Sequence, residues 1–100
     1  MRVCWTDTAR GNLDDIYRYI ARSSPQYALQ TVDRLTRRSI QIAFMPMSGR
    51  IVPEFERPQL REVGEGPYRI IYHLLPDRVD VLAVIHGARD VLTSQPEDEA

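Results

Sequence analysis

The sequence of 100 residues contains no lysine, a single cysteine and no long apolar run. All 13 basic residues are arginines, so chemistry that needs a lysine base or nucleophile is excluded, whereas bidentate contacts to phosphate or carboxylate groups remain available. The single Cys4 excludes an internal disulfide and a zinc cluster built from cysteines. We expect no transmembrane helix, no contact with a membrane and, because an apolar signal core is missing, a cytoplasmic protein.

The charges are unevenly distributed along the chain. The formal net charge is −1, and Glu97, Asp98 and Glu99 lie in the C-terminal stretch TSQPEDEA, which has no core-forming side chain. Removing these three charges leaves +2 for the remainder. We therefore predict one domain over residues 1–92 and a disordered acidic tail over residues 93–100. So low a positive charge suits nucleic acid poorly, and we expect no direct binding to DNA.

The first half of the chain predicts a short strand and two helices. Arg2–Trp5 is the strand, and Thr6 is a suitable N-cap for the helix that follows. Ser24 and Pro25 suit the N-cap and first position of a second helix. This helix should stop near residues 44–45, because Pro46 disfavours helical backbone in the residue before it. In the first helix, the apolar residues recur at the spacing of one helix face; they are Ala9, Leu13, Ile16, Tyr17, Ile20 and Ala21.

The second half predicts a loop over residues 46–58, a short strand over 59–63 and a β-hairpin from Tyr68 to Asp90. The hairpin turn falls at Pro76 and Asp77. The expected order is β-α-α-β-β-β. Because helices and strands are segregated along the chain, we predict an α+β fold with a two-helix hairpin packed on a small antiparallel sheet.

Pairing Leu75 with Arg78 would give the hairpin one apolar face and one mixed face. The apolar face would hold Tyr68, Ile70, Tyr72, Leu74, Val79, Val81, Ala83 and Ile85. The other would hold Arg69, Ile71, His73, Asp80, Leu82, Val84 and His86. A sheet needs one apolar face to build a core, so we expect the second face to be exposed.

Several polar side chains are candidates for a site on that exposed face. The set Arg61, Arg69 and Arg89 with His86 would bind phosphate or carboxylate groups, or each would be an ordinary surface group. His73, opposite Asp80, would be an oriented general base or half of a surface pair. The histidine spacing gives no metal-ligand pattern, and we expect no cofactor. Gly49-Arg50 with Glu54 has too few glycines for a phosphate-binding loop.

Taken together, these segments resemble the RelE/ParE toxin superfamily of bacterial type II toxin–antitoxin systems, over about residues 3 to 92. The matching segments are Trp5-Thr6, Leu13 to Ala21, Ser24-Pro25, Pro46 with Gly49-Arg50, Leu60-Arg61-Glu62, Tyr68 to Tyr72, and Val84 to Arg89. The resemblance implies a compact β-α-α-β-β-β domain that a cognate, ParD-like antitoxin neutralises. We expect Trp5, Tyr19 and Tyr27 to contact this antitoxin.

The superfamily has two activities: some members cut messenger RNA on the ribosome, and ParE-like members inhibit DNA gyrase by binding it. Arg69 and Arg89 match functional positions of the ribonucleases. The paired lysines expected before Tyr68 are replaced by Leu60 and Glu62, and a tyrosine expected after Arg89 is absent. The incomplete set favours a gyrase inhibitor over an enzyme.

Two alternatives remain at this point. One is a ribosome-dependent endoribonuclease that uses Arg69, His86 and Arg89. The other is a degenerate toxin that only binds its antitoxin. For the leading hypothesis, the side chains expected to contact target or partner are Arg61, Arg69, His73, His86 and Arg89.

Overall fold

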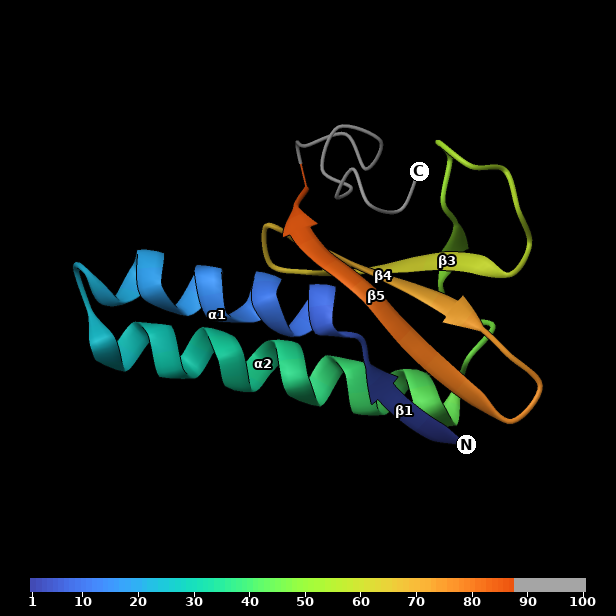
Figure 1. The fold of residues 1–100 in the computed structure, drawn as a ribbon, viewed down its shortest axis with the longest axis horizontal. Coiled ribbons are helices and arrows are strands. Elements are labelled where there is room, and N and C mark those ends of the chain that lie inside the picture. Colours follow the sequence, from blue (N-terminus) through green and yellow to red (C-terminus); the bar gives the residue numbers. More distant parts are fainter. Residues whose placement is uncertain (88–100) are drawn as a thin grey trace.

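The computed structural model describes residues 1–87, in which two helices lie along one side of a five-stranded sheet (Figure 1). The helices are α1 (Asp7–Ala21) and α2 (Pro25–Phe44). The strands are β1 (Arg2–Trp5), β2 (Arg50–Ile51), β3 (Leu60–Glu65), β4 (Tyr68–Leu74) and β5 (Arg78–His86). Their spatial order is β1-β5-β4-β3-β2, with β1 parallel to β5 and the other neighbours antiparallel. The α+β prediction is confirmed, with the two-residue strand β2 added inside the expected loop.

Both helices begin where the sequence predicts. The Thr6 hydroxyl accepts a hydrogen bond from the backbone N–H of Ala9 (3.1 Å), and the Ser24 hydroxyl accepts one from that of Tyr27 (3.1 Å). These side chains satisfy backbone donors that the first turn of a helix leaves unpaired. Within residues 1–87, neither helix combines the length and apolar character needed to cross a membrane.

The main core lies between the helices and the sheet. Its buried members are Ala9, Leu35, Ile42, Val63, Ile70, Tyr72, Val79, Val81 and Val84. Alternate residues of β4, and of β5 as far as Val81, point to this side, as expected for a sheet with one face on a helical layer. The apolar face predicted for β4 is confirmed, because Tyr68 and Leu74 also pack against this core.

A β-bulge changes the predicted face of the second half of β5. His73 pairs with Asp80 and Tyr72 with Val81 as predicted, but the register then shifts, so that Ile71 pairs with Ala83. Because side chains alternate between faces, one extra residue moves every later side chain to the opposite side. The prediction that Ala83 and Ile85 line the main core is wrong, as is the placement of Val84 and His86 on the other face.

The second face of the sheet is also covered, so the expectation of an exposed face is wrong. Val52 and Phe55, from the segment between β2 and β3, pack with Ile71 and Ile85 in a second apolar cluster. Leu60 and Ala83 border it. Apolar residues in the proline-rich segment around Val52 were the sequence signal for this cover. The predictions for Arg89, for the domain end at residue 92 and for the acidic tail lie outside the described residues.

Candidate functional site

Arg69 of β4 lies between two carboxylates beside the second apolar cluster. Its Nη1 and Nη2 donate to Glu54 Oε2 (3.1 Å) and Oε1 (3.0 Å), a bidentate pairing. Its Nε donates to Glu62 Oε1 (2.9 Å), and Nη2 also contacts that oxygen. The side chain of Arg69 is 12% exposed and that of Glu62 is 5% exposed. These contacts hold the segment that contains Glu54 against the centre of the sheet.

The network extends to the edge of the sheet through Arg50 of β2. Arg50 Nε donates to Glu62 Oε2 at 2.6 Å, while the rest of the Arg50 side chain is exposed. We call Arg50, Glu54, Glu62 and Arg69 the charged quartet. The two positive and two negative formal charges of the quartet balance, as the mostly buried Glu54, Glu62 and Arg69 beside an apolar cluster require.

The quartet fixes the protonation state of Arg69. The hydrogen bonds that Arg69 donates to Glu54 are the largest cause that raises the pKa of its guanidinium, and those that it donates to Glu62 raise it further, against the opposing effect of burial. A guanidinium already has a very high pKa, so Arg69 stays charged at any pH at which the protein functions. Its donors are directed at carboxylates of its own chain.

The structure does not bring together the four side chains of the first candidate set. Arg61 is opposite Tyr72 in the β3–β4 pairing, so it points to the helix side of the sheet, whereas Arg69 points to the other side. His86 pairs with Tyr68 beyond the bulge and also lies on the helix side, where the two rings meet edge to face at 6.0 Å. The predicted single face with Arg61, Arg69 and His86 is therefore wrong. Arg89 lies outside the described residues.

The predicted pairing of His73 with Asp80 is confirmed as a register. The Asp80 carboxylate accepts a hydrogen bond from Arg78 Nε at 2.9 Å, so one of its oxygens is already engaged by a neighbour on β5. Over residues 1–87, no group of three or more histidine, cysteine, aspartate or glutamate side chains is arranged to hold a metal ion.

Tyr72 and Gly49 have linked roles that sequence reasoning missed. The Tyr72 hydroxyl donates to the carbonyl of Pro46 (2.6 Å) and accepts from the backbone N–H of Gly49 (3.1 Å). A Cβ on Gly49 would meet this hydroxyl and come within 2.7 Å of the Glu62 carbonyl oxygen. Position 49 thus requires glycine, because the loop approaches the sheet too closely for a side chain. Burial raises the pKa of the Tyr72 hydroxyl above its ordinary value.

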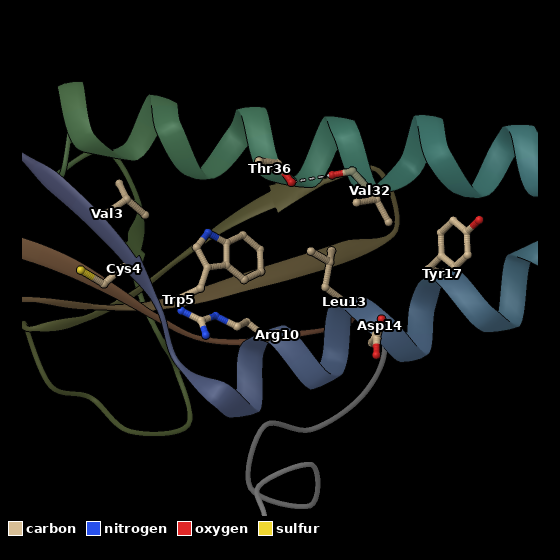
Figure 2. A pocket seen from close by; sticks show the side chains of 9 residues that line it. All are labelled: Val3, Cys4, Trp5, Arg10, Leu13, Asp14, Tyr17, Val32 and Thr36. Atoms are coloured by element: carbon tan, nitrogen blue, oxygen red, sulfur yellow. Dashed lines mark hydrogen bonds between the residues drawn. The ribbon is translucent and has the colours of Figure 1, made fainter.

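An open groove of about 640 Å³ lies between α1 and α2, with β1 at one end (Figure 2). Its apolar lining comes from Val3, Trp5, Leu13, Tyr17 and Val32, with Arg10 and Asp14 among its polar residues. The Trp5 indole N–H donates to the Ser39 hydroxyl at 3.3 Å, which holds the half-buried ring between β1 and α2. The groove thus combines an apolar lining with two charged side chains of α1, Arg10 and Asp14.

The other two aromatic candidates lie away from Trp5, where α1 meets α2. Tyr19 is 72% exposed and Tyr27 is 50% exposed, and both line a depression at this junction. The Arg22 guanidinium lies 5.9 Å from the centre of the Tyr19 ring. The three candidates therefore lie on two separate surfaces: Trp5 of β1 lines the groove, and Tyr19 and Tyr27 lie where α1 meets α2.

Comparisons with known proteins agree with this architecture. The family model for the "ParE toxin of type II toxin-antitoxin system, parDE" matches residues 3–91. The chromosomal ParDE system from P. aeruginosa contains a similar chain, with a TM-score of 0.72 and 22% identity over 86% of this chain and 95% of that one. The toxin–antitoxin complex RelBE2 from Mycobacterium tuberculosis also contains a similar chain, with a TM-score of 0.61 and 20% identity over 85% of this chain and 95% of that one. No curated protein matches the sequence.

The two structural similarities, at these identities, establish the fold. The family match begins within β1 and spans both helices, the other four strands and the whole charged quartet. The chain belongs to the family of ParE toxins of type II toxin–antitoxin systems.

Proposed function

We propose that this toxin acts by binding DNA gyrase and inhibiting it, and that a cognate antitoxin neutralises it by covering the helical hairpin. The observation that carries the proposal is the position of Arg69. Its guanidinium is bound to Glu54 and Glu62 of the same chain. A toxin with its sheet arginine engaged in this way is better equipped to bind a protein than to stabilise the charge of a reacting phosphate.

The remaining candidate groups also fit binding better than RNA cleavage. Cleavage needs a base for the 2′-hydroxyl, an acid for the leaving oxygen and a cation at the phosphate. His86 and Arg69 lie on opposite sides of the sheet, because the bulge separates them. Both carboxylate oxygens of Glu62 accept hydrogen bonds from Arg50 and Arg69, so both are engaged within the chain.

The direct test is DNA supercoiling by purified gyrase with increasing amounts of toxin. We expect loss of negatively supercoiled product and accumulation of gyrase–DNA cleavage complexes. Unchanged supercoiling and unchanged cleavage complexes at micromolar toxin would contradict the proposal.

Primer extension on translated messages distinguishes the alternative activity. Codon-linked cuts after induction of the toxin would support a ribosome-dependent ribonuclease instead. Normal growth after induction, together with retained antitoxin binding, would identify a degenerate toxin.

For the antitoxin, we propose an amphipathic helix whose apolar side lies in the groove between α1 and α2. The groove offers Trp5, Leu13 and Tyr17 as apolar contacts, and Arg10 and Asp14 as charged ones. This arrangement suits the helix-in-groove mode of recognition. Tyr19 and Tyr27 would contact a further part of the same antitoxin, at the junction of the two helices.

A substitution in α1 tests this antitoxin site. Tyr17→Ser removes an aromatic side chain from the groove and should weaken antitoxin binding by about tenfold or more, since buried aromatic contacts dominate such interfaces. Asp15→Ser, on another side of α1 and absent from the groove lining, is the matched control. Equal binding by both variants, measured by calorimetry, would place the antitoxin elsewhere.

A further inference from the structure

The C-terminal end of α2 carries exposed apolar side chains that share no residue with the lining of the groove. Phe44 is 80% exposed, Met45 65% and Met47 61%. Ile40, on the preceding turn of α2, and Ile51, in β2, are also exposed. We call these five residues the α2-end surface. Clustered exposed apolar side chains on a small domain mark an interaction site.

The loop within this surface is held in place by the sheet. The Tyr72 hydroxyl donates a hydrogen bond to the carbonyl of Pro46 and accepts one from the backbone N–H of Gly49. Arg61 Nη1 donates to the carbonyl oxygen of Gly49 at 3.0 Å, and its Nε donates to that of Pro58 at 2.8 Å. The exposed methionine side chain of Met47 therefore projects from an anchored backbone. A pre-organised backbone lowers the entropy lost when a partner binds.

Two cations beside the α2-end surface stand apart from the other arginines of this region. From Arg34 to Pro53 the chain carries four arginines and no carboxylate, but Arg37 pairs with Asp33 and Arg50 with Glu62. Arg61 Nη1 contacts the carbonyl oxygens of Met47 (3.4 Å) and Gly49 (3.0 Å) in the anchored loop, and Arg38 lies in the last two turns of α2, just before this loop. Within residues 1–87, Arg38 donates to the Gln41 side chain and Arg61 to backbone carbonyls, and neither pairs with a carboxylate.

We propose that the α2-end surface is where the toxin contacts its protein target. The target presents an amphipathic segment, whose apolar side chains cover Phe44, Met45 and Met47 and whose flanking carboxylates approach Arg38 and Arg61. Methionine side chains adapt to the shape of an apolar partner, and complementary charge orients the approach. This proposal rests on the proposed function, since gyrase is the target that the experiment uses.

Other occupants fit the surface less well. A second copy of this chain, joined by a two-fold contact, would bring two sets of arginines together and leave both without counter-charges. A nucleic acid would supply phosphates for Arg38 and Arg61, but its contacts are mainly polar and would leave the apolar centre uncovered. A protein segment with carboxylates beside apolar side chains satisfies both features.

The experiment compares three toxin variants in the full-length chain. Phe44→Ser with Met47→Ser removes two exposed apolar contacts, and Arg38→Glu reverses one charge at the border. Leu29→Ser is the matched control, because Leu29 is also an exposed apolar residue of α2 (61%) but lies outside this surface. Each variant is assayed for inhibition of gyrase supercoiling, growth arrest on induction, antitoxin binding, thermal unfolding and sedimentation.

We expect the double variant to need at least about tenfold more toxin for half-inhibition of supercoiling, as for a small cluster of dominant contacts. Arg38→Glu should give about a tenfold loss that shrinks with added salt. Both should fail to arrest growth, while antitoxin binding, unfolding temperature and sedimentation match those of wild type. Leu29→Ser should behave like wild type throughout.

Four outcomes would overturn the inference. These are full inhibition by the double variant, an equal loss in Leu29→Ser, a loss of antitoxin binding in parallel, and a wild-type dimer that the double variant dissociates. If wild-type toxin does not inhibit gyrase, the proposed function fails. Loss of growth arrest in the double variant alone would then still support the surface, with another protein as target.

Discussion

The two faces of the sheet are built in different ways. The helix side buries a continuous apolar core around Leu35, Ile70 and Tyr72, whereas the other side combines a small apolar cluster with the charged quartet. Apolar packing tolerates many side chains of similar volume. A buried charge requires its partner, because removing one member leaves the other unpaired. The quartet therefore constrains Glu54, Glu62 and Arg69 together, and the exposed Arg50 adds a second cation to Glu62.

The largest expected effect comes from breaking the quartet. Glu62→Ala removes the carboxylate that both Arg50 and Arg69 contact and leaves the mostly buried Arg69 with Glu54 as its charge partner. We expect the free energy of unfolding to fall by about 3–5 kcal/mol, as when one partner of a buried ion pair is removed. Urea denaturation measures this change.

A double-mutant cycle is the control for that substitution. Arg69→Met should lower the free energy of unfolding much less in the Glu62→Ala background than in wild type. In that background the charge that it removes has already lost Glu62 as a partner. Equal costs in both backgrounds would show that the two side chains act independently and that the quartet is not a unit.

On the helix side, Leu35→Ala provides the apolar benchmark. Leu35 is almost fully buried in α2, and its truncation should cost about 3 kcal/mol through lost burial and the cavity left behind. Thermal unfolding followed by circular dichroism gives the value. A cost below about 1 kcal/mol, as for an exposed site, would mean that the helices pack loosely on the sheet.

Gly49→Ala tests the loop that links the two faces. The added methyl group would collide with the Tyr72 hydroxyl and the Glu62 carbonyl, so the loop must shift. Overpacking of this kind costs about 2 kcal/mol. Gly11→Ala is the matched control, because a Cβ there meets no neighbouring atom. If both variants unfold at the same urea concentration, the close approach at Gly49 is not required.

Tyr72→Phe should make stability less dependent on alkaline pH. The folded protein raises the pKa of this hydroxyl above the unfolded value of 10.0, so its contribution is complete below pH 10 and is lost as pH rises through the folded pKa. At pH 8 the variant should be about 1 kcal/mol less stable, because hydrogen bonds are lost. Between pH 10 and 11 it should lose less stability than wild type. Identical losses in urea titrations would refute this.

The smallest effect is expected for a surface pair. Asp14 and Arg18 form an ion pair at 3.0 Å, and both side chains are exposed. Asp14→Asn should change the free energy of unfolding by less than about 0.5 kcal/mol, since water and salt screen such a pair. A change comparable to that of Glu62→Ala would remove the contrast between buried and exposed pairs on which this account depends.

The sequence predicted the helical half of the fold better than the sheet. Thr6, Ser24 and Pro25 specify the helix starts through local chemistry, and the helices begin there. The hairpin register was also correct near its turn. The bulge in β5 was not predictable from alternation, because Leu82 and Ala83 are both apolar and fit either face.

The sequence predicted only one member of the charged quartet, Arg69, as a site residue. Arg50 and Glu54 were considered together only as a phosphate-binding loop, which the sequence argued against, and their contacts depend on how the segment between β2 and β3 folds over the sheet. No local pattern encodes that tertiary contact. His86 was assigned to the wrong face because its position depends on the bulge.

The most direct test of the central claim, inhibition by binding, uses gyrase, relaxed plasmid, ATP and purified toxin, with no ribosome or RNA present. The measurement is the fraction of plasmid supercoiled as toxin concentration increases, with and without prior addition of antitoxin. We predict progressive loss of supercoiling that antitoxin reverses. Full supercoiling at every toxin concentration, with codon-linked cleavage of translated messages by the same preparation, would contradict the account.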